Sequence, residues 1–299
     1  MESISKQINI ITVLLLSVSL VIPAMAQDIS VTEDKINQPK AVRNTFESAW
    51  LVDNQTTLVP PKGTFEMDIL HRFGTVNKGY EDFFGLYAPS NIRIGFSYSL
   101  IDKLNVGFGF TKIQLSWDFT GKYAILQQMK GGGSPVNLTY YGNISISTRD
   151  RVNFINSTDR LAYFNQLIVS RKITSKFSAQ GAISLSHFNA VEGFVNQEGG
   201  IEGKMKNDHV AIAFGSRYKV SDVMALIVNY DQPVTKHTTN NPRPNISFGI
   251  EVATSGHAFQ VFAGNYSNII PQLNNMYNQN DYQEGQFLIG FNITRLWNF

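Results

Sequence analysis

Residues 104–110 read LNVGFGF, in which large apolar residues alternate with glycine or asparagine at every second position. Successive side chains of an extended strand point to opposite faces, so a period of two predicts a strand with one apolar face. The same alternation occurs on both sides of this stretch, at 92–98 and at 117–125. We therefore expect this part of the chain to consist of amphipathic strands.

The alternation continues from residue 63 to the C-terminus in about twelve segments, close to the 9–11 residues of a tilted membrane strand. Two segments, 160–171 and 222–230, are apolar on both faces, so the pattern does not assign their inward side. The predicted strands lie at about 65–69, 92–98, 104–110, 117–125, 136–144, 160–171, 176–186, 208–218, 222–230, 245–253, 258–266 and 286–299.

The connections between these strands alternate in length. Short turns lie near 101–103, 173–175, 219–221 and 254–256, and long polar loops lie at about 74–89, 147–159, 187–207, 231–244 and 267–285. Two joints, 111–114 and 131–133, break the alternation. Transmembrane barrels have short turns on one side and long loops on the other. The predicted fold class is all-β, a single transmembrane antiparallel β-barrel of about twelve strands over residues 63–299.

The first 26 residues have the pattern of an export signal. Lys6 precedes an apolar run at 8–22, and Ala24-Met25-Ala26 forms a small-x-small cleavage site. Cleavage there makes Gln27 the first mature residue, and an uncleaved anchor is the alternative. Together with the strands, this signal predicts a location in the cell outer membrane.

Residues 27–62 lack the period of two. Asn44 and Glu47 have the spacing of a capping box, and Phe46, Ala49 and Trp50 lie at helical spacing. We expect a short helix or ordered arm on the periplasmic side, or a small plug that enters the lumen. A flexible leader is the alternative.

The last strand is amphipathic up to its end, where Trp297 and Phe299 share the apolar parity. A final strand that ends in Phe is similar to the assembly signal of outer-membrane barrels. The expected partners are therefore outer-membrane lipid and the barrel-assembly machinery, which would bind the C-terminal strand.

Several stretches of the chain carry a resemblance to a known family. They are residues 45–50, 53–55, 71–74, 80–82, 87–93, 138–143 and 185–192. These stretches resemble an uncharacterised family of Gram-negative outer-membrane β-barrel proteins, and the resemblance covers most of the mature chain. It implies the fold and the location, and it brings no activity and no catalytic residue.

Composition limits the partners and the reactive or metal-binding groups that the chain can have. The formal net charge of +2 gives no support for a nucleic-acid partner. The chain has no cysteine, which excludes disulfides, thiolate metal sites and a cysteine nucleophile. His71, His209, His237 and His257 do not pair at metal-ligand spacing. No metal and no cofactor is predicted.

The most suggestive catalytic grouping is Ser184, Ser186, His187 and Asn189, because twelve-stranded outer-membrane phospholipases use Ser, His and Asn. Strand parity opposes this interpretation. The two serines are even and the other two residues odd, so they point to opposite faces of one strand. A membrane-embedded lipid hydrolase is therefore the third hypothesis, and the chain is not expected to be an enzyme.

Charged residues of both signs have the parity of the predicted lumen. They are Glu66, Asp68, Arg72, Arg93, Asp118, Lys122, Arg217 and Glu251. The first hypothesis is a passive pore for small solutes that diffuse past this mixed-charge lining. An interior filled by paired charges is the alternative, since twelve strands lie between filled small barrels and open porins. A structural or surface-interaction barrel that uses its long loops is the second hypothesis.

Overall fold

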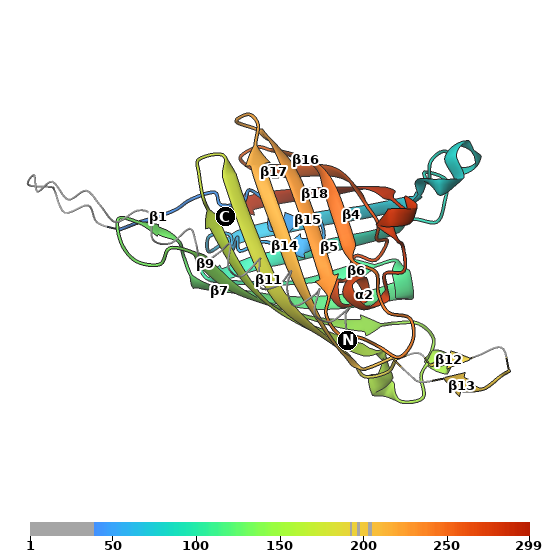
Figure 1. Ribbon diagram of the computed structural model, residues 1–299. Coiled ribbons are helices and arrows are strands. Elements are labelled where there is room, and N and C mark those ends of the chain that lie inside the picture. The colour runs from blue at the N-terminus through green and yellow to red at the C-terminus, as the bar shows by residue number, and fades with distance from the viewer. Residues whose placement is uncertain (1–38, 192, 196–197, 203–204) are drawn as a thin grey trace, which may run out of the picture. The chain divides into compact units, whose positions relative to one another are not determined.

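The computed structural model of the 299-residue chain describes residues 39–191, 193–195, 198–202 and 205–299. The predicted signal segment, residues 1–26, lies outside the described residues. In the described part, twelve strands form one closed antiparallel barrel (Figure 1). They are β4 (Thr64–Thr75), β5 (Asn91–Ile101), β6 (Leu104–Thr111), β7 (Ser116–Leu126), β9 (Asn137–Ser147), β10 (Leu161–Lys172), β11 (Phe177–Phe188), β14 (Asp208–Lys219), β15 (Met224–Pro233), β16 (Asn245–Ala253), β17 (His257–Gly264) and β18 (Leu288–Asn298).

Each barrel strand pairs with the next barrel strand along the chain, and β18 pairs with β4 to close the ring. The predicted fold class and strand number are confirmed. At this seam Gly63 has φ 83°, a conformation that favours glycine, and a Cβ there would lie 3.2 Å from the Phe299 carbonyl oxygen. The residue before the first barrel strand therefore lies against the last residue of the chain.

The two faces of the strands differ as the alternation predicts. On β7, Trp117 and Phe119 are 46% and 48% exposed on the outside, whereas Asp118 between them is 1% exposed on the inside. Rings of exposed apolar side chains would be a liability in water, and they are what a lipid-facing surface requires. Among the described residues, no helix is long and apolar enough to cross a membrane.

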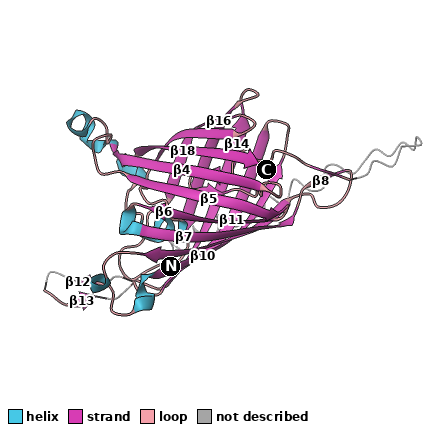
Figure 2. Cartoon of the chain, turned by 180° about the vertical axis from the view of Figure 1, so that it is seen from behind, coloured by secondary structure: helices cyan, strands magenta, loops and turns pink. Residues whose placement is uncertain are grey.

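Most of the long connections gather at one end of the barrel, which we call the loop end, and most of the short turns at the other, the turn end; the joints between β6 and β7 and between β7 and β9 are the exceptions. The small sheet β12 (Phe194–Val195) with β13 (Ile201–Glu202) lies at the loop end, and β1 (Lys40–Ala41) with β8 (Met129–Lys130) lies at the turn end (Figures 1 and 2). The loop-end connections also contain α2 (Pro271–Tyr277), η1 (Val76–Asp82), η2 (Ile113–Leu115), η3 (Arg151–Asn153), η4 (Ser157–Arg160) and η5 (Tyr282–Glu284).

Residues 44–62, here called the inner segment, are bonded to the inward side chains of the barrel and contain the hairpin β2 (Trp50–Leu51) and β3 (Asn54–Gln55). The helix predicted from Asn44 is wrong. Asn44 and Val52 have φ 55° and 59°, in the left-handed region that interrupts a right-handed helix. A capping-box spacing reports only a local preference, and here contacts with distant strands decide the backbone instead.

Candidate functional site: a closed polar lumen

All eight charged residues of the predicted lining lie on the inner face of the barrel. Each is at most 5% exposed, and each alternates along its strand with outward-facing neighbours. Buried charges are tolerated when they are paired or hydrogen-bonded, so the partner of each charge decides what this interior is.

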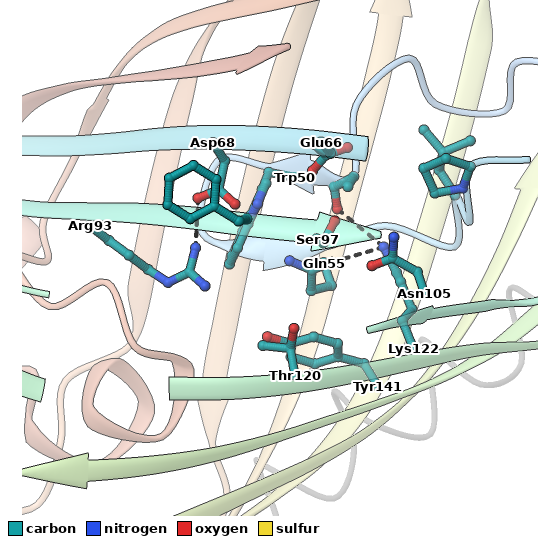
Figure 3. Close-up of a pocket in the computed structure, with 14 residues that line it drawn as sticks. Trp50, Gln55, Glu66, Asp68, Arg93, Ser97, Asn105, Thr120, Lys122 and Tyr141 are labelled. Carbon is teal, nitrogen blue, oxygen red and sulfur yellow. Dashed lines mark hydrogen bonds and ion pairs between the residues drawn. The ribbon is translucent and has the colours of Figure 1, made fainter. Parts of the chain in front are cut away.

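Arg93 of β5 bridges two carboxylates on neighbouring strands. Its Nη1 donates to Asp68 Oδ1 at 2.6 Å, and its Nε and Nη2 donate to the two oxygens of Asp118 at 3.0 and 2.8 Å. Asn143 Nδ2 donates to the same Asp118 at 3.1 Å. Figure 3 shows Arg93 and Asp68 facing each other beside Trp50, whose ring lies 5.5 Å from the guanidinium carbon. One cation thus holds two anions inside the wall.

A second pair joins β14 to β16. Arg217 Nε donates to Glu251 Oε1 at 2.6 Å, and Gln260 of β17 donates to the other carboxylate oxygen at 2.9 Å. In this region the charged side chains of the wall pair with one another. The groups around Arg93 and Arg217 therefore match the interpretation of an interior filled by paired charges.

Two further cations also bond to the inner segment. Lys122 Nζ donates to Gln55 Oε1 at 2.8 Å and to the Ala49 carbonyl at 3.5 Å, as Figure 3 shows for Gln55. Arg72 Nη2 donates to the Val52 carbonyl at 3.4 Å. Glu66 lies near Lys122, on the lining of a cavity between wall and inner segment. That cavity measures about 20 Å³, which is room for about one water molecule.

The inner segment is bonded around most of the circumference. Eight of the twelve strands each contribute a side chain that hydrogen-bonds to it. They are Arg72 (β4), Lys122 (β7), Thr139 (β9), Gln166 (β10), Gln180 (β11), Asn229 (β15), Gln260 (β17) and Asn292 (β18). Several donate to backbone carbonyls, which any sequence would offer in this conformation. The segment therefore occupies the lumen as a fitted insert.

A small apolar patch on the inner wall receives the tip of the hairpin. Leu51 and Val52 pack against Ile227 of β15 and Phe262 of β17. Trp50 packs in a second cluster with Leu70 of β4. These inward apolar positions explain why the segment 222–230 appeared apolar on both faces: one face meets lipid and the other meets the inner segment.

Asp53, at the turn of the hairpin, is the point where most elements meet. Its carboxylate accepts hydrogen bonds from Asn229 Nδ2 at 2.7 Å, from the Tyr266 hydroxyl at 3.0 Å and from Asn274 Nδ2 at 2.5 Å. Burial raises the pKa of the Asp53 carboxyl, and the positive charge of Arg72 and the bond from Tyr266 oppose that rise. Burial also raises the pKa of Tyr266 far above its usual value, so its hydroxyl remains a donor at neutral pH.

The helix α2 closes the lumen nearer the loop end. Gln272 Nε2 donates to Asn143 Oδ1 at 2.9 Å and to Ser145 Oγ at 2.8 Å, both on β9. Asn275 Nδ2 donates to Ser184 Oγ of β11 at 3.2 Å. Pro271 begins the helix, and its five central residues are all buried, which is unusual for so polar a sequence. Its amides take the place of water inside the barrel.

The serines and histidine of the hydrolase hypothesis do not meet. Ser184 and Ser186 are buried on the inner face, and His187 is on the exposed side, where its Nδ1 lies 2.8 Å from Asp208 Oδ1. Asn189 donates to the Thr158 carbonyl in the loops. Among the described residues, no hydrogen bond joins either serine to a histidine, and no group of three or more His, Cys, Asp or Glu could hold a metal.

Sequence reasoning missed the neutral members of this site. Asn229, Tyr266, Asn274 and Gln272 carry no charge, and no spacing rule singles them out. Asp231 was assigned to a loop, whereas it belongs to β15 and accepts from Asn54 Nδ2 at 2.6 Å. Alternate positions of β15 point into the lumen, and this alternation could have identified Asn229 and Asp231. The apolar residues on both faces of the segment 222–230 concealed it.

The fold and the interior define a membrane-bound β-barrel whose lumen is filled by its own chain. Over residues 46–297 the chain matches the model of the family described as "Membrane bound beta barrel domain (DUF5777)", and it belongs to that family. The predicted membership of an uncharacterised barrel family is confirmed. A comparison with curated proteins finds no match.

Solved structures with a similar fold include porins and channels. The NanC porin is 9% identical, with a TM-score of 0.48, over 79% of this chain and 99% of that chain. The KdgM porin is 10% identical, with a TM-score of 0.43, over 78% and 99%. An outer membrane channel from Pseudomonas putida F1 is 12% identical, with a TM-score of 0.46, over 80% and 97%. At these identities the likeness concerns the barrel fold alone.

Proposed function

We propose that this protein is an outer-membrane pore or transporter for small solutes whose lumen is closed by its own inner segment. The observation that supports this most is the polar nature of the closure. Wall side chains such as Lys122, Gln180 and Asn292 bond to the inner segment. If the segment leaves, these groups line a hydrated passage with charges of both signs.

A barrel with a purely structural role would not need a polar interior. Buried ion pairs can often be replaced by apolar residues at no loss of stability. Here the inward apolar side chains of the wall form separate clusters, around Ile227 and Phe262, around Leu70, and around Phe164 and Ile168. The remaining wall keeps the polar side chains that a solute pathway needs, including all eight residues of the predicted lining.

The test is a reversible lock on the inner segment. The hydroxyl oxygens of Thr57 and Ser170 lie 2.5 Å apart, so cysteines at both positions are placed to form a disulfide between the inner segment and β10. The chain has no other cysteine. We expect the reduced Thr57→Cys/Ser170→Cys protein to show single-channel steps in a planar bilayer, and the oxidised protein to show none.

The single variant Thr57→Cys is the matched control, and oxidation should leave its conductance unchanged. Equal conductance of the double variant in both redox states would show that the inner segment does not gate the lumen. A wild-type protein that never conducts, at high salt and under applied voltage, would contradict the pore itself.

A second candidate function is a structural or surface-interaction barrel without transport. The closure of the lumen by both the inner segment and α2 favours it. Its long loops would then bind a partner at the cell surface. Deletion of the loop residues 187–207 without loss of a partner would count against it, and permeability of the wild-type protein to small solutes would exclude it.

We further propose that the chain is exported with cleavage after Ala26 and that its C-terminal strand is bound by the barrel-assembly machinery. Trp297 packs against Phe65 of β4 with ring centroids 5.6 Å apart, and Phe299 is 90% exposed at the end of the seam. N-terminal sequencing of the membrane fraction should find Gln27 first. Phe299→Ala should lower the amount of heat-modifiable barrel, and an unchanged amount would contradict the assembly proposal.

A further inference from the structure

A second, larger cavity lies at the loop end, above the closed lumen. It has a volume of about 440 Å³, within the range of sites for small molecules. It is lined by residues from the start of β7, the end of β9, the loop after β9, the start of β10, the end of β11 and α2. Its lining includes Ser147, Arg149, Phe154, Asp159, Arg160 and Phe188, together with Leu273 and Tyr277 of α2. We call this cavity the vestibule.

Two arginines of the loop after β9 converge on the same residue. Arg149 Nε donates to Ser147 Oγ at 3.4 Å, and Arg160 Nη1 donates to the Ser147 carbonyl at 3.2 Å. Both guanidinium carbons also lie over the ring of Phe154, at 5.8 and 4.8 Å from its centroid. Ser147 and Phe154 thus hold two positive charges next to each other at the edge of the vestibule.

Neither Arg149 nor Arg160 takes part in an ion pair among the described residues. Asp159 lines the same cavity, but its oxygens accept from the Asn156 backbone N–H at 2.7 Å and from Asn156 Nδ2 at 3.5 Å, which ties it to its own turn. Two adjacent cations repel each other, and an anion between them relieves that repulsion.

The remaining donors suit an oxyanion such as a carboxylate. A guanidinium has five N–H donors in a planar fork, and each arginine uses one of them in a bond to Ser147. The fork matches a carboxylate in a bidentate arrangement. Phe188 and Tyr277, which also line the vestibule, meet edge to face with ring centroids 5.2 Å apart and form an aromatic surface. The vestibule therefore combines a carboxylate-binding end with an apolar end.

We propose that the vestibule binds small organic carboxylates that carry a ring, with the carboxylate on Arg149 and Arg160 and the ring against Phe188 and Tyr277. Leu273 and Tyr277 of α2 line this site, whereas Gln272 and Asn275 of the same helix bond to the barrel wall below it. A bound carboxylate would thus contact the helix that closes the lumen. The idea that such compounds are the transported solutes rests on the proposed function. Their binding to the vestibule does not depend on it.

The test is calorimetric titration of the refolded full chain in detergent with benzoate, and with benzyl alcohol as the neutral analogue. We expect benzoate to bind at least about tenfold more tightly than benzyl alcohol. Arg149→Gln/Arg160→Gln should weaken benzoate binding by at least about tenfold and leave benzyl alcohol binding nearly unchanged. The matched control is Arg151→Gln, an exposed arginine of the same loop that does not line the vestibule.

Three results would overturn the site: no benzoate binding to the wild type, equal binding to the double variant, or an equal loss in Arg151→Gln. Heat-modifiable migration on SDS gels checks that each variant is folded. If the double variant does not fold, Arg160→Lys keeps the charge without the planar fork and should still weaken benzoate binding. Unchanged benzoate binding to Arg160→Lys would overturn the bidentate contact.

The binding site and the proposed function can fail separately. Benzoate binding by a barrel that never conducts would leave the site standing and remove the proposed function. Conductance without benzoate binding would overturn the site and leave the proposed function standing.

Discussion

The inner segment and α2 both close the lumen, but they are held in different ways. The inner segment is held in good part through its backbone, because wall side chains donate to the carbonyls of Trp50, Val52 and Gln55. Side chains of the segment such as Asn54 and Gln55 add further bonds to the wall. The helix α2 is held through its own side-chain amides, such as Gln272 and Asn275. A backbone-held element depends on the shape of the lumen, and a side-chain-held element depends on single residues. The first closure should tolerate most single substitutions, and the second should not.

Asp53 is the exception that joins the two closures. It belongs to the inner segment, yet its side chain accepts from Asn274 of α2 and from Tyr266 in the same loop, as well as from Asn229 of the wall. Displacement of α2 would leave the Asp53 carboxylate with fewer donors. The two closures are therefore expected to open together more often than independent elements would.

The largest expected effect comes from removing the backbone-held closure altogether. Deletion of residues 44–59 takes away the hairpin and its bonds to eight strands, so the lumen should conduct in a planar bilayer in long-lived steps. Deletion of residues 78–84, in an exposed loop-end turn, is the control and should leave conductance unchanged. A folded 44–59 deletion that stays closed would mean that α2 alone seals the barrel.

Asp53→Ala should come next. It leaves the donors of Asn229, Tyr266 and Asn274 buried without their acceptor, at a cost of about 3 kcal/mol, which corresponds to roughly a hundredfold shift in the docking equilibrium. Single buried cysteines, Thr57→Cys in the inner segment and Ser184→Cys under α2, report opening as a rate of maleimide labelling. Asp53→Ala should raise both rates. An increase at only one reporter would separate the two closures.

Gln272→Ala should have a smaller and more local effect. It removes the bonds to Asn143 and Ser145, about 1–2 kcal/mol, so labelling at Ser184→Cys should rise roughly tenfold while Thr57→Cys changes little. The control is Gln279→Ala, an exposed amide of the same loop with a surface bond to Asn240. Similar rates in Gln272→Ala and the control would show that α2 is not held by its side chains.

The smallest expected effect is a dependence on pH. Burial raises the pKa of Asp53 in the docked segment relative to a hydrated one, so the docked state binds a proton more tightly. Docking is therefore strongest below the ordinary carboxyl pKa and weakens as pH rises through the raised value. Labelling at Thr57→Cys should increase with pH once it is corrected for thiolate formation. Asp53→Asn should remove this dependence, and an unchanged slope would assign it to another group.

The barrel could be predicted from the sequence because a period of two is a local property. Each strand needs only its own neighbours to reveal which side faces lipid, as Trp117 and Asp118 do. The length of the connections then orders the strands into an up-and-down ring. Eight charged residues of the inner face could be named for the same reason, whereas Asp231 of β15 was missed.

The contents of the lumen could not be predicted in this way. The conformation of residues 44–62 is set by partners such as Gln260 and Asn292, more than 200 positions away, and the local pattern favoured a helix instead. Inward apolar residues such as Ile227 and Phe262 broke the alternation because they face another protein segment rather than water. Neutral side-chain amides hold α2 against the barrel wall, and no sequence motif distinguishes them from surface amides.

The seam between β18 and β4 bears on the order of assembly. The inner segment ends next to Gly63 at this seam, and its partners come from both halves of the chain, Lys122 from the first half and Asn229 and Asn292 from the second. The two halves surround the segment fully only when the last strand has paired with the first. A barrel arrested before that step leaves residues 44–62 without most of their bonds and open to proteases. Resistance of this stretch to proteolysis therefore marks the moment at which the wall is complete.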